Sequence, residues 1–230
     1  MRKIIQRALE VGLLLIGGMM LVWTVIPEKR EVAIANLSPD AMQLKIEGQA
    51  DTPAILNNRR IELAWPSTLR IGDSYTMEMN FEPRKDDPPS SAQQQGFLDI
   101  YGNYNVMAEA RFEVAGLRVE PANPIRESMP SGQGLKFKWK IIAEKSGIYD
   151  GTVWLSLRFL PLDGSPPSQE PVHVQSIRMQ ATSLLGMSAP MIRLVGGVGV
   201  VLGTAFLLAD RIVGVRRRKI KLTANDRKDL

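Results

Sequence analysis

Apolar and polar residues alternate along most of the central part of the chain. The segment 135–141 is the clearest case, because apolar residues at its odd positions are separated by lysines. The same period of two occurs at 42–46, 61–65, 75–81, 105–114 and 153–159. Successive side chains of a strand point to opposite faces, so this period predicts strands with one buried face.

The segments also predict a fold class. Gly and Pro turns separate them, and no helical period is sustained between them. The central part is therefore predicted to be all-β, an antiparallel immunoglobulin-like β-sandwich of about eight or nine strands. The segment 172–179 is predicted to be the last strand, and the polar stretch 84–96 a loop at one end of the sandwich, either binding or solvated.

Two of the segments are predicted to form a hairpin. The residues Glu-Lys-Ser-Gly at 144–147 lie between 135–141 and 153–159, and Gly147 suits the positive φ that such a turn requires. This hairpin predicts an interaction surface as well.

The apolar residues of 153–159 are expected to face inward, which leaves Trp154 and Arg158 facing outward. These two residues would lie next to the face with Lys136, Lys138 and Lys140. An outward indole beside cations is typical of a surface that contacts a partner, a glycan or lipid headgroups. The alternative is an ordinary solvated sheet face, with a loop covering Trp154.

Both ends of the chain contain an uncharged apolar stretch, at 11–26 and at 194–209. As helices 8–27 and 188–210, with Ser188 as N-cap, both are long enough to cross a hydrocarbon core of roughly 30 Å. A cleavable signal peptide is the alternative for the first stretch. Its apolar core is long and no small-x-small pattern follows it, which favours a retained transmembrane helix.

The charges predict an orientation. Three basic residues precede the first span, and the tail 211–230 contains eight. The stretch 27–209 holds 18 basic and 20 acidic residues, so the net charge of +5 comes from the ends. By the positive-inside rule, the N-terminus 1–7 and the basic tail 211–230 are cytoplasmic, and the domain 28–182 is extracytoplasmic. The tail is expected to rest on anionic lipid headgroups, and no nucleic acid is expected as a partner.

Glycines are frequent in both predicted spans. Gly17 and Gly18 are adjacent in the first, and Gly199 and Gly203 have GxxxG spacing in the second. Glycine lets helix backbones approach closely, so these residues are candidates for helix packing. The packing would join the two spans of one chain, or the spans of two chains in a homo-oligomer.

The sequence predicts no catalytic, metal or cofactor site. The absence of cysteine excludes disulfides and thiolate chemistry, and His173 is the only histidine. No catalytic motif surrounds that histidine. Asp86 and Asp87 lack the further oxygen ligands that calcium needs. Met77 and Met79 suit cuprous ion, but their alternation with aromatic residues favours packing in the core.

The sequence therefore predicts a non-catalytic, two-pass protein of the cytoplasmic (plasma) membrane. Its sandwich would act on the extracytoplasmic side as an accessory, scaffold or interaction subunit of a membrane assembly. The expected partners are membrane lipids and another membrane or cell-surface protein. The alternative is a ligand-binding sensor that signals through its paired transmembrane helices to a partner. That alternative requires a separate signalling protein, because only about twenty residues follow the second span.

Overall fold

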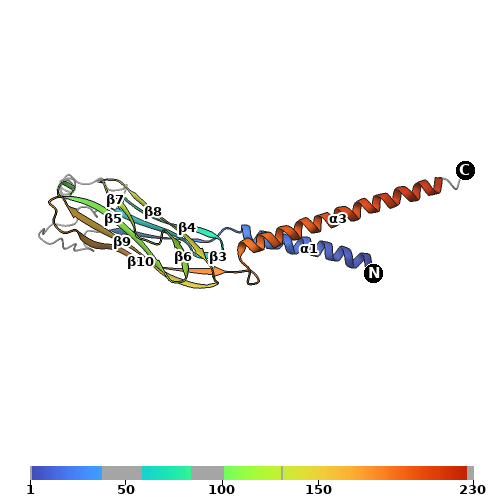
Figure 1. Cartoon of the computed structure of the whole chain (residues 1–230), viewed down its shortest axis with the longest axis horizontal. Helices are drawn as coiled ribbons and strands as arrows, with labels where there is room; N and C mark the ends of the chain where they lie inside the picture. Colours follow the sequence, from blue (N-terminus) through green and yellow to red (C-terminus); the bar gives the residue numbers. More distant parts are fainter. Residues whose placement is uncertain (1, 38–58, 84–100, 131, 227–230) are drawn as a thin grey trace. The chain divides into compact units, whose positions relative to one another are not determined.

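The computed structural model describes residues 2–37, 59–83, 101–130 and 132–226, with side chains between 11 and 209 in these ranges. The predicted strand 42–46 and loop 84–96, with Asp86 and Asp87, lie outside the described residues. The chain divides into two compact units. Residues 28–182 form a β domain, and residues 1–27 with 183–230 form a helical unit (Figure 1).

The first sheet of the β domain has the strand order β1-β2-β4-β8-β6, and all its pairings are antiparallel. Its strands are β1 (Arg30–Leu37), β2 (Arg59–Pro66), β4 (Ser74–Pro83), β8 (Leu135–Ala143) and β6 (Leu117–Glu120). The strands β2, β4 and β8 contain the predicted segments 61–65, 75–81 and 135–141. Period two therefore identified the three central strands of this sheet.

The second sheet has the order β3-β10-β9-β5-β7. Its strands are β3 (Thr68–Arg70), β10 (Ser168–Thr182), β9 (Gly147–Pro161), β5 (Tyr104–Val114) and β7 (Ile125–Ser128). The pair β3–β10 is parallel and the other pairs are antiparallel. A register shift between Pro171 and His173 interrupts the long β9–β10 ladder.

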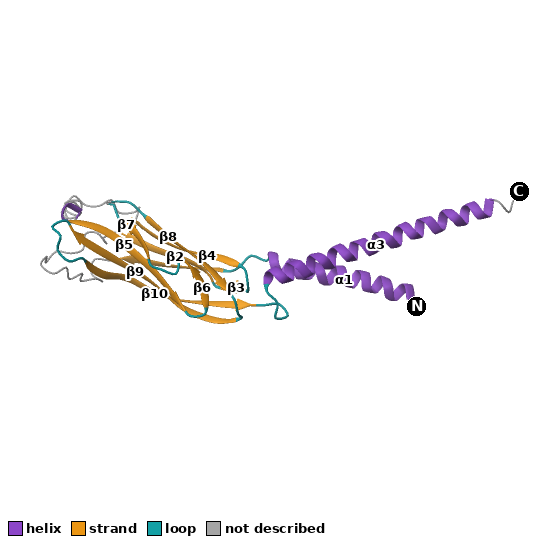
Figure 2. Ribbon diagram, in the orientation of Figure 1, coloured by secondary structure: helices purple, strands orange, loops and turns teal. Residues whose placement is uncertain are grey.

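Figure 2 shows the strands of both sheets. Their inner faces form one hydrophobic core. Phe112 of β5 and Trp139 of β8 meet edge to face across it, with ring centroids 6.3 Å apart. Met77 and Met79 are completely buried, as their alternation with Tyr75 and Phe81 predicts. Unbranched thioether side chains fill the irregular space between aromatic rings, which explains why methionines suit this position.

The predicted hairpin of 135–141 and 153–159 is wrong. The two segments lie in different sheets, since β8 pairs with β4 and β6, whereas β9 pairs with β5 and β10. The short connection after Ala143 crosses from one sheet to the other. Both arrangements bury every second residue, so the alternation could not distinguish a hairpin from a crossing between sheets.

The helical unit contains α1 (Arg2–Val25) and α3 (Ala189–Asp226). The carbonyl oxygen of Ser188 accepts a hydrogen bond from the amide of Ile192 at 3.0 Å, so the second helix begins where the N-cap was predicted. Its end differs from the prediction of 188–210. The helix continues without a break through most of the basic tail. Gly214 does not interrupt it, and 215–226 contains neither glycine nor proline that would end it.

Candidate interaction surfaces

The two helices pack against each other through glycine. A Cβ atom placed on Gly17 would lie 2.8 Å from the carbonyl oxygen of Gly196 and 3.1 Å from the backbone nitrogen of Val200. A Cβ atom on Gly196 would in turn lie 3.0 Å from the carbonyl oxygen of Gly17. No larger residue fits at either position without separating the backbones, so these two glycines define the helix seam.

Part of the predicted glycine set lies at the seam. Gly199 lies beside Gly17, because its Cβ position is 3.6 Å from the Gly17 Cα atom, and Gly203 is buried one turn further along α3. Gly18 has nothing within 4 Å of its Cβ position and takes no part. Gly196 was missing from the prediction. Its position at i−3 from Gly199 is the helical spacing that could have identified it.

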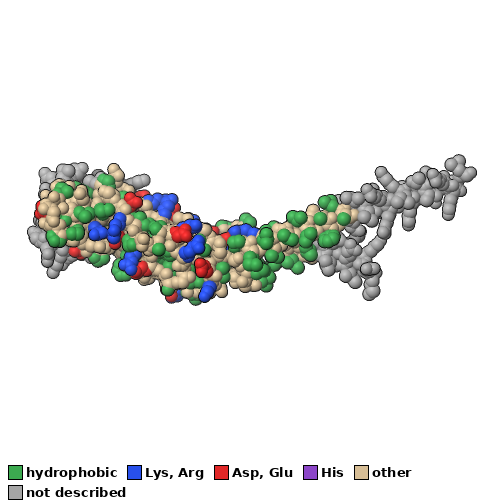
Figure 3. Space-filling view, viewed as in Figure 1, with side chains coloured by type: hydrophobic (Ala, Val, Ile, Leu, Met, Phe, Trp, Pro, Cys, Tyr) green, Lys and Arg blue, Asp and Glu red, His purple; other side chains and the backbone are tan. Residues whose placement is uncertain are grey.

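Large apolar side chains lie on the outside of the helix pair. Met19 and Val25 of α1 are 78% and 79% exposed, and Leu194 and Val201 of α3 are similarly open. Figure 3 shows hydrophobic side chains dominating the visible face of the described helical segments, whereas charged side chains are scattered over the β domain. Small residues inside and large apolar residues outside reverse the arrangement of a helix pair in water.

One segment is long and apolar enough to cross a membrane. This is Ala189–Ala209 in α3, of 21 residues. The apolar part of α1, Val11–Val25, is shorter than that, so the described residues contain one such segment and not the two that the sequence predicts. The predicted first span 8–27 also begins among residues whose side chains the structure does not describe.

Trp154 lies on the outer face of the second sheet, as predicted. It is 37% exposed and faces outward between inward-facing Val153 and Leu155. Its direct cross-strand neighbours are Arg111 of β5 and Val174 of β10. Val174 is 46% exposed, so the indole and this β-branched side chain form an outward apolar pair, here named the Trp154 face.

An ionic cluster borders the Trp154 face. Glu109 of β5 accepts a hydrogen bond from Nε of Arg126 at 2.6 Å and lies 3.6 Å from the guanidinium of Arg158. Gln169 donates to its other oxygen at 3.3 Å. Partial burial acts to raise the pKa of Glu109, but the hydrogen bond and charge of Arg126 and the other two partners outweigh it and lower the pKa. Arg158 is therefore committed to this cluster.

The predicted surface does not include the lysines. Lys136, Lys138 and Lys140 belong to β8 and point outward from the first sheet, whereas Trp154 points outward from the second. Glu78 pairs with Lys136 at 2.7 Å and with Lys138 at 3.1 Å. These lysines therefore belong to a ladder of ion pairs on the first sheet and not to a cationic patch around the indole.

The ladder continues at the edge of the first sheet. Lys140 lies 3.3 Å from Glu120 of β6, which also pairs with Arg118 at 3.3 Å. Hydrogen bonds from its two lysine partners lower the pKa of Glu78, so this carboxylate keeps its charge easily. Exposed pairs of this kind are each worth about 0–1 kcal/mol, so they set the character of the surface more than its stability.

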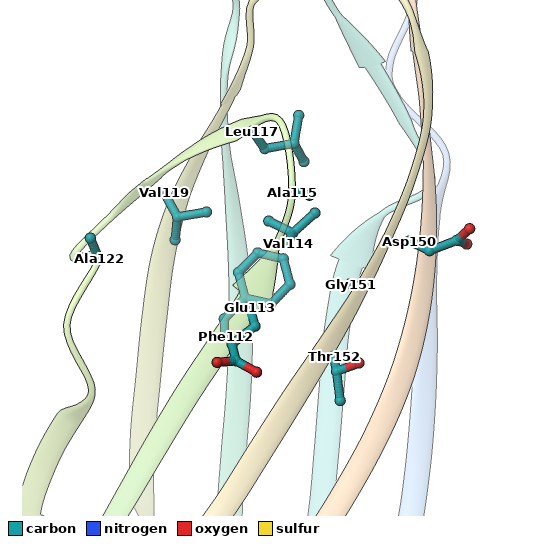
Figure 4. Close-up of a pocket in the computed structure, with 10 residues that line it drawn as sticks. All are labelled: Phe112, Glu113, Val114, Ala115, Leu117, Val119, Ala122, Asp150, Gly151 and Thr152. Carbon is teal, nitrogen blue, oxygen red and sulfur yellow. The ribbon is translucent and has the colours of Figure 1, made fainter.

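A cavity of about 480 Å³ opens at the edge of the sandwich (Figure 4). It lies between the end of β5, the strap 115–122 and the start of β9, and Phe112, Val114 and Leu117 are among its apolar lining residues. Asp150 and Glu113 stand at its rim. Both are engaged by arginines, Asp150 with Arg178 at 2.7 Å and Glu113 with Arg111. Both charged residues that line the cavity are therefore paired.

One charged residue of the inner face is structural. Arg59 is almost fully buried, donates to the carbonyl oxygen of Gln133 at 2.9 Å and lies 4.8 Å from the ring centre of Phe81. Burial lowers the pKa of Arg59, and nearby Tyr101 acts to raise it. Arg59 was missing from the predicted site residues, although extending the period of 61–65 by one step back to position 59 indicates an inward side chain.

His173 lies at the register shift of β10, opposite Leu155. Partial burial lowers its pKa, so the neutral imidazole is favoured in the folded state. No group of three or more potential metal-ligating side chains occurs among the described residues.

No family model and no curated protein matches the sequence. Among solved structures, the chain is similar to Escherichia coli alpha-2-macroglobulin, with 12% identity, a TM-score of 0.31, and coverage of 54% of this chain but 8% of that one. The PapD-like domain 7 of human CEP192 gives 12% identity, a TM-score of 0.30, and coverage of 62% and 96%. AggA, the major subunit of an Escherichia coli fimbria, gives 8% identity, a TM-score of 0.26, and coverage of 69% and 98%. Similarities this distant assign no function to the chain.

Proposed function

We propose that this chain is a non-catalytic, two-pass membrane protein, with both termini in the cytoplasm and the β domain on the extracytoplasmic side. It acts there as an accessory or interaction subunit of a membrane assembly. The observation that supports this best is the helix pair, in which glycines form the seam and large apolar side chains point outward. Such a pair would expose a wide apolar surface to water, whereas in lipid the same side chains are solvated by acyl chains.

The limited length of the apolar part of α1 is compatible with this proposal. A bilayer adapts to a short span by local thinning and by flanking residues that reach the interface, at fractions of a kcal/mol per Å. Close packing against α3 compensates further, because the seam at Gly17 lies within the apolar part of α1. The basic ends then give the orientation through the positive-inside rule.

The interaction role is supported by the Trp154 face. Aromatic residues are enriched at the centre of protein interfaces, and Trp154 with Val174 forms an outward apolar pair on the second sheet. The chain connections also restrict the domain. Only 26–29 lie between α1 and β1, and only 183–188 between β10 and α3. A domain tied at both ends by such short connections stays near the bilayer and favours lateral partners.

Topology can be tested cleanly because the protein has no native cysteine. We expect an introduced cysteine at Lys145 to react with a membrane-impermeant maleimide in intact cells. A cysteine at Lys221 should react only after permeabilisation. Labelling of the tail but not of the domain in intact cells would overturn the proposed orientation. If an outer membrane or cell wall blocks the reagent, it is permeabilised first, and a domain cysteine that still does not react would place the domain inside the cell.

The interaction role needs a separate test. Full-length wild type and Trp154→Ala are purified in a mild detergent after crosslinking in cells, with Ser176→Ala on the same face as the matched control. We expect Trp154→Ala to lose a crosslinked species that Ser176→Ala retains, with the unfolding free energy changed by less than about 1 kcal/mol. Identical crosslinking in all three proteins would remove the Trp154 face from the proposal.

A further inference from the structure

A tight turn precedes α3 in the helical unit. The amide of Met187 donates to the carbonyl oxygen of Leu184 at 3.0 Å, and the two residues form an isolated β-bridge. The central residues Leu185 and Gly186 have φ angles of 54° and 72°. Positive φ at both central positions defines a type I′ turn, for which asparagine, aspartate and glycine are the usual residues.

Leucine at the first central position is unfavourable in two ways. A bulky side chain at positive φ is a steric outlier, and Leu185 is the only non-glycine with positive φ among the described residues. Its side chain is also 75% exposed, so the described residues leave most of it uncovered. Backbone strain at an exposed apolar residue indicates a role that the folded chain alone does not explain.

The position of the turn indicates what covers this leucine. Leu185 is four residues before Ala189, so the turn tip lies within about 14 Å of the start of the membrane-spanning candidate. Exposed apolar side chains continue from the turn onto the first turns of α3, with Met191 and Leu194 at 55% and 69% exposure. Exposed apolar side chains therefore lie both at the tip of the turn and along the first turns of α3.

We propose that the turn 184–187 is an interfacial anchor that inserts Leu185 into the boundary between lipid headgroups and acyl chains. The proposal rests on the membrane insertion of α3. The occupant is the lipid surface itself, since an apolar tip at this depth meets headgroup carbons and upper acyl chains. The β-turn holds Leu185 outward, which fixes the start of α3 at the membrane surface.

The test uses the full chain in phosphatidylcholine vesicles, with one cysteine labelled by the environment-sensitive fluorophore NBD. Three positions are compared: Leu185→Cys at the turn, Val198→Cys in the centre of the span, and Leu162→Cys. Leu162 is the matched control, because it is 58% exposed in a glycine-containing loop at the opposite end of β9 and β10. Nitroxide lipids with shallow or deep spin labels report the depth of each fluorophore.

We expect the fluorophore at 185 to emit at shorter wavelength than that at 162, and to be quenched by shallow nitroxides at a depth of roughly 5–10 Å. The fluorophore at 198 should be quenched by deep nitroxides. If 198 is quenched and 185 behaves like 162, the anchor is wrong and the membrane proposal stands. If 198 is not quenched, the membrane proposal itself fails.

A second variant tests the anchor without a label. Leu185→Asn suits the same φ, so it should fold as wild type does. In vesicles we expect several-fold faster amide hydrogen exchange at Leu184–Met187 in this variant, because the turn leaves the interface. The exchange rate of the loop 162–165 in the same protein serves as the reference for a loop in water. Exchange as slow as wild type in Leu185→Asn would overturn the anchor.

Discussion

Replacing Gly17 with valine tests the helix seam directly. A Cβ atom at this position would meet two backbone atoms, the carbonyl oxygen of Gly196 at 2.8 Å and the nitrogen of Val200 at 3.1 Å. Backbone atoms inside a helix cannot rotate away as a side chain does. The two helices must therefore move apart, which also loses the contacts at Gly199.

The magnitude follows from the packing. Forcing extra atoms into a close contact costs about 1–3 kcal/mol. A loss of about 2 kcal/mol shifts the equilibrium between packed and separated helices roughly 30-fold. Gly18→Val is the matched control, since it adds the same β-branched residue to the same helix where nothing lies within 4 Å. Intrinsic helix propensity therefore cancels in the comparison.

The assay is the distance between spin labels at Met19→Cys and Val201→Cys, measured by pulsed electron paramagnetic resonance in the full chain in vesicles. Both side chains point away from the seam, with 78% and 67% exposure, so the labels do not disturb it. We expect a longer and broader distance distribution for Gly17→Val and an unchanged one for Gly18→Val. Equal distributions in the two variants would refute the reasoning.

Three predictions concern the β domain. Gly151→Ala should destabilise it by about 1–3 kcal/mol in urea unfolding, since its Cβ would lie 2.8 Å from Phe112 Cε2, whereas Gly102→Ala, with open space, should be near neutral. Burial lowers the pKa of His173, so the folded state resists protonation and the unfolding free energy should fall as pH drops below about 6.5. His173→Gln should remove this part of the pH dependence. An equal change of unfolding free energy with pH in both proteins would contradict the prediction. Glu78→Gln should lower the unfolding free energy by less than about 1 kcal/mol at neutral pH. Because the pKa of Glu78 is lowered in the fold, this difference from wild type should vanish as pH falls through the range in which carboxylates titrate. A difference that persists in acid would exclude the lysine pairs as its cause.

The sequence predicts the faces of the strands but not their partners. Alternation identified the inward side chains of 153–159 correctly, because the period depends only on the local pleat. Pairing depends on which strands meet after collapse. The strands β8 and β9 are adjacent in sequence, yet they belong to different sheets and face each other across the core. The lysine surface predicted around Trp154 failed for this reason alone.

The helix seam shows the same limit from the opposite direction. A high glycine content indicates that helices can approach closely, but it does not distinguish one glycine of a span from another. The rotation of the helix about its axis decides which glycines face the partner. Gly17 and Gly18 differ by one residue, or about 100° around the axis, and only Gly17 meets α3. On α3 the buried Gly196 and Gly203 and the half-buried Gly199 between them follow the helical spacing of three and four. Since Gly12 and Gly197 also have open space at their Cβ positions, their substitution by alanine should leave the seam intact, which separates the tolerance of membrane helices for glycine from its use in packing.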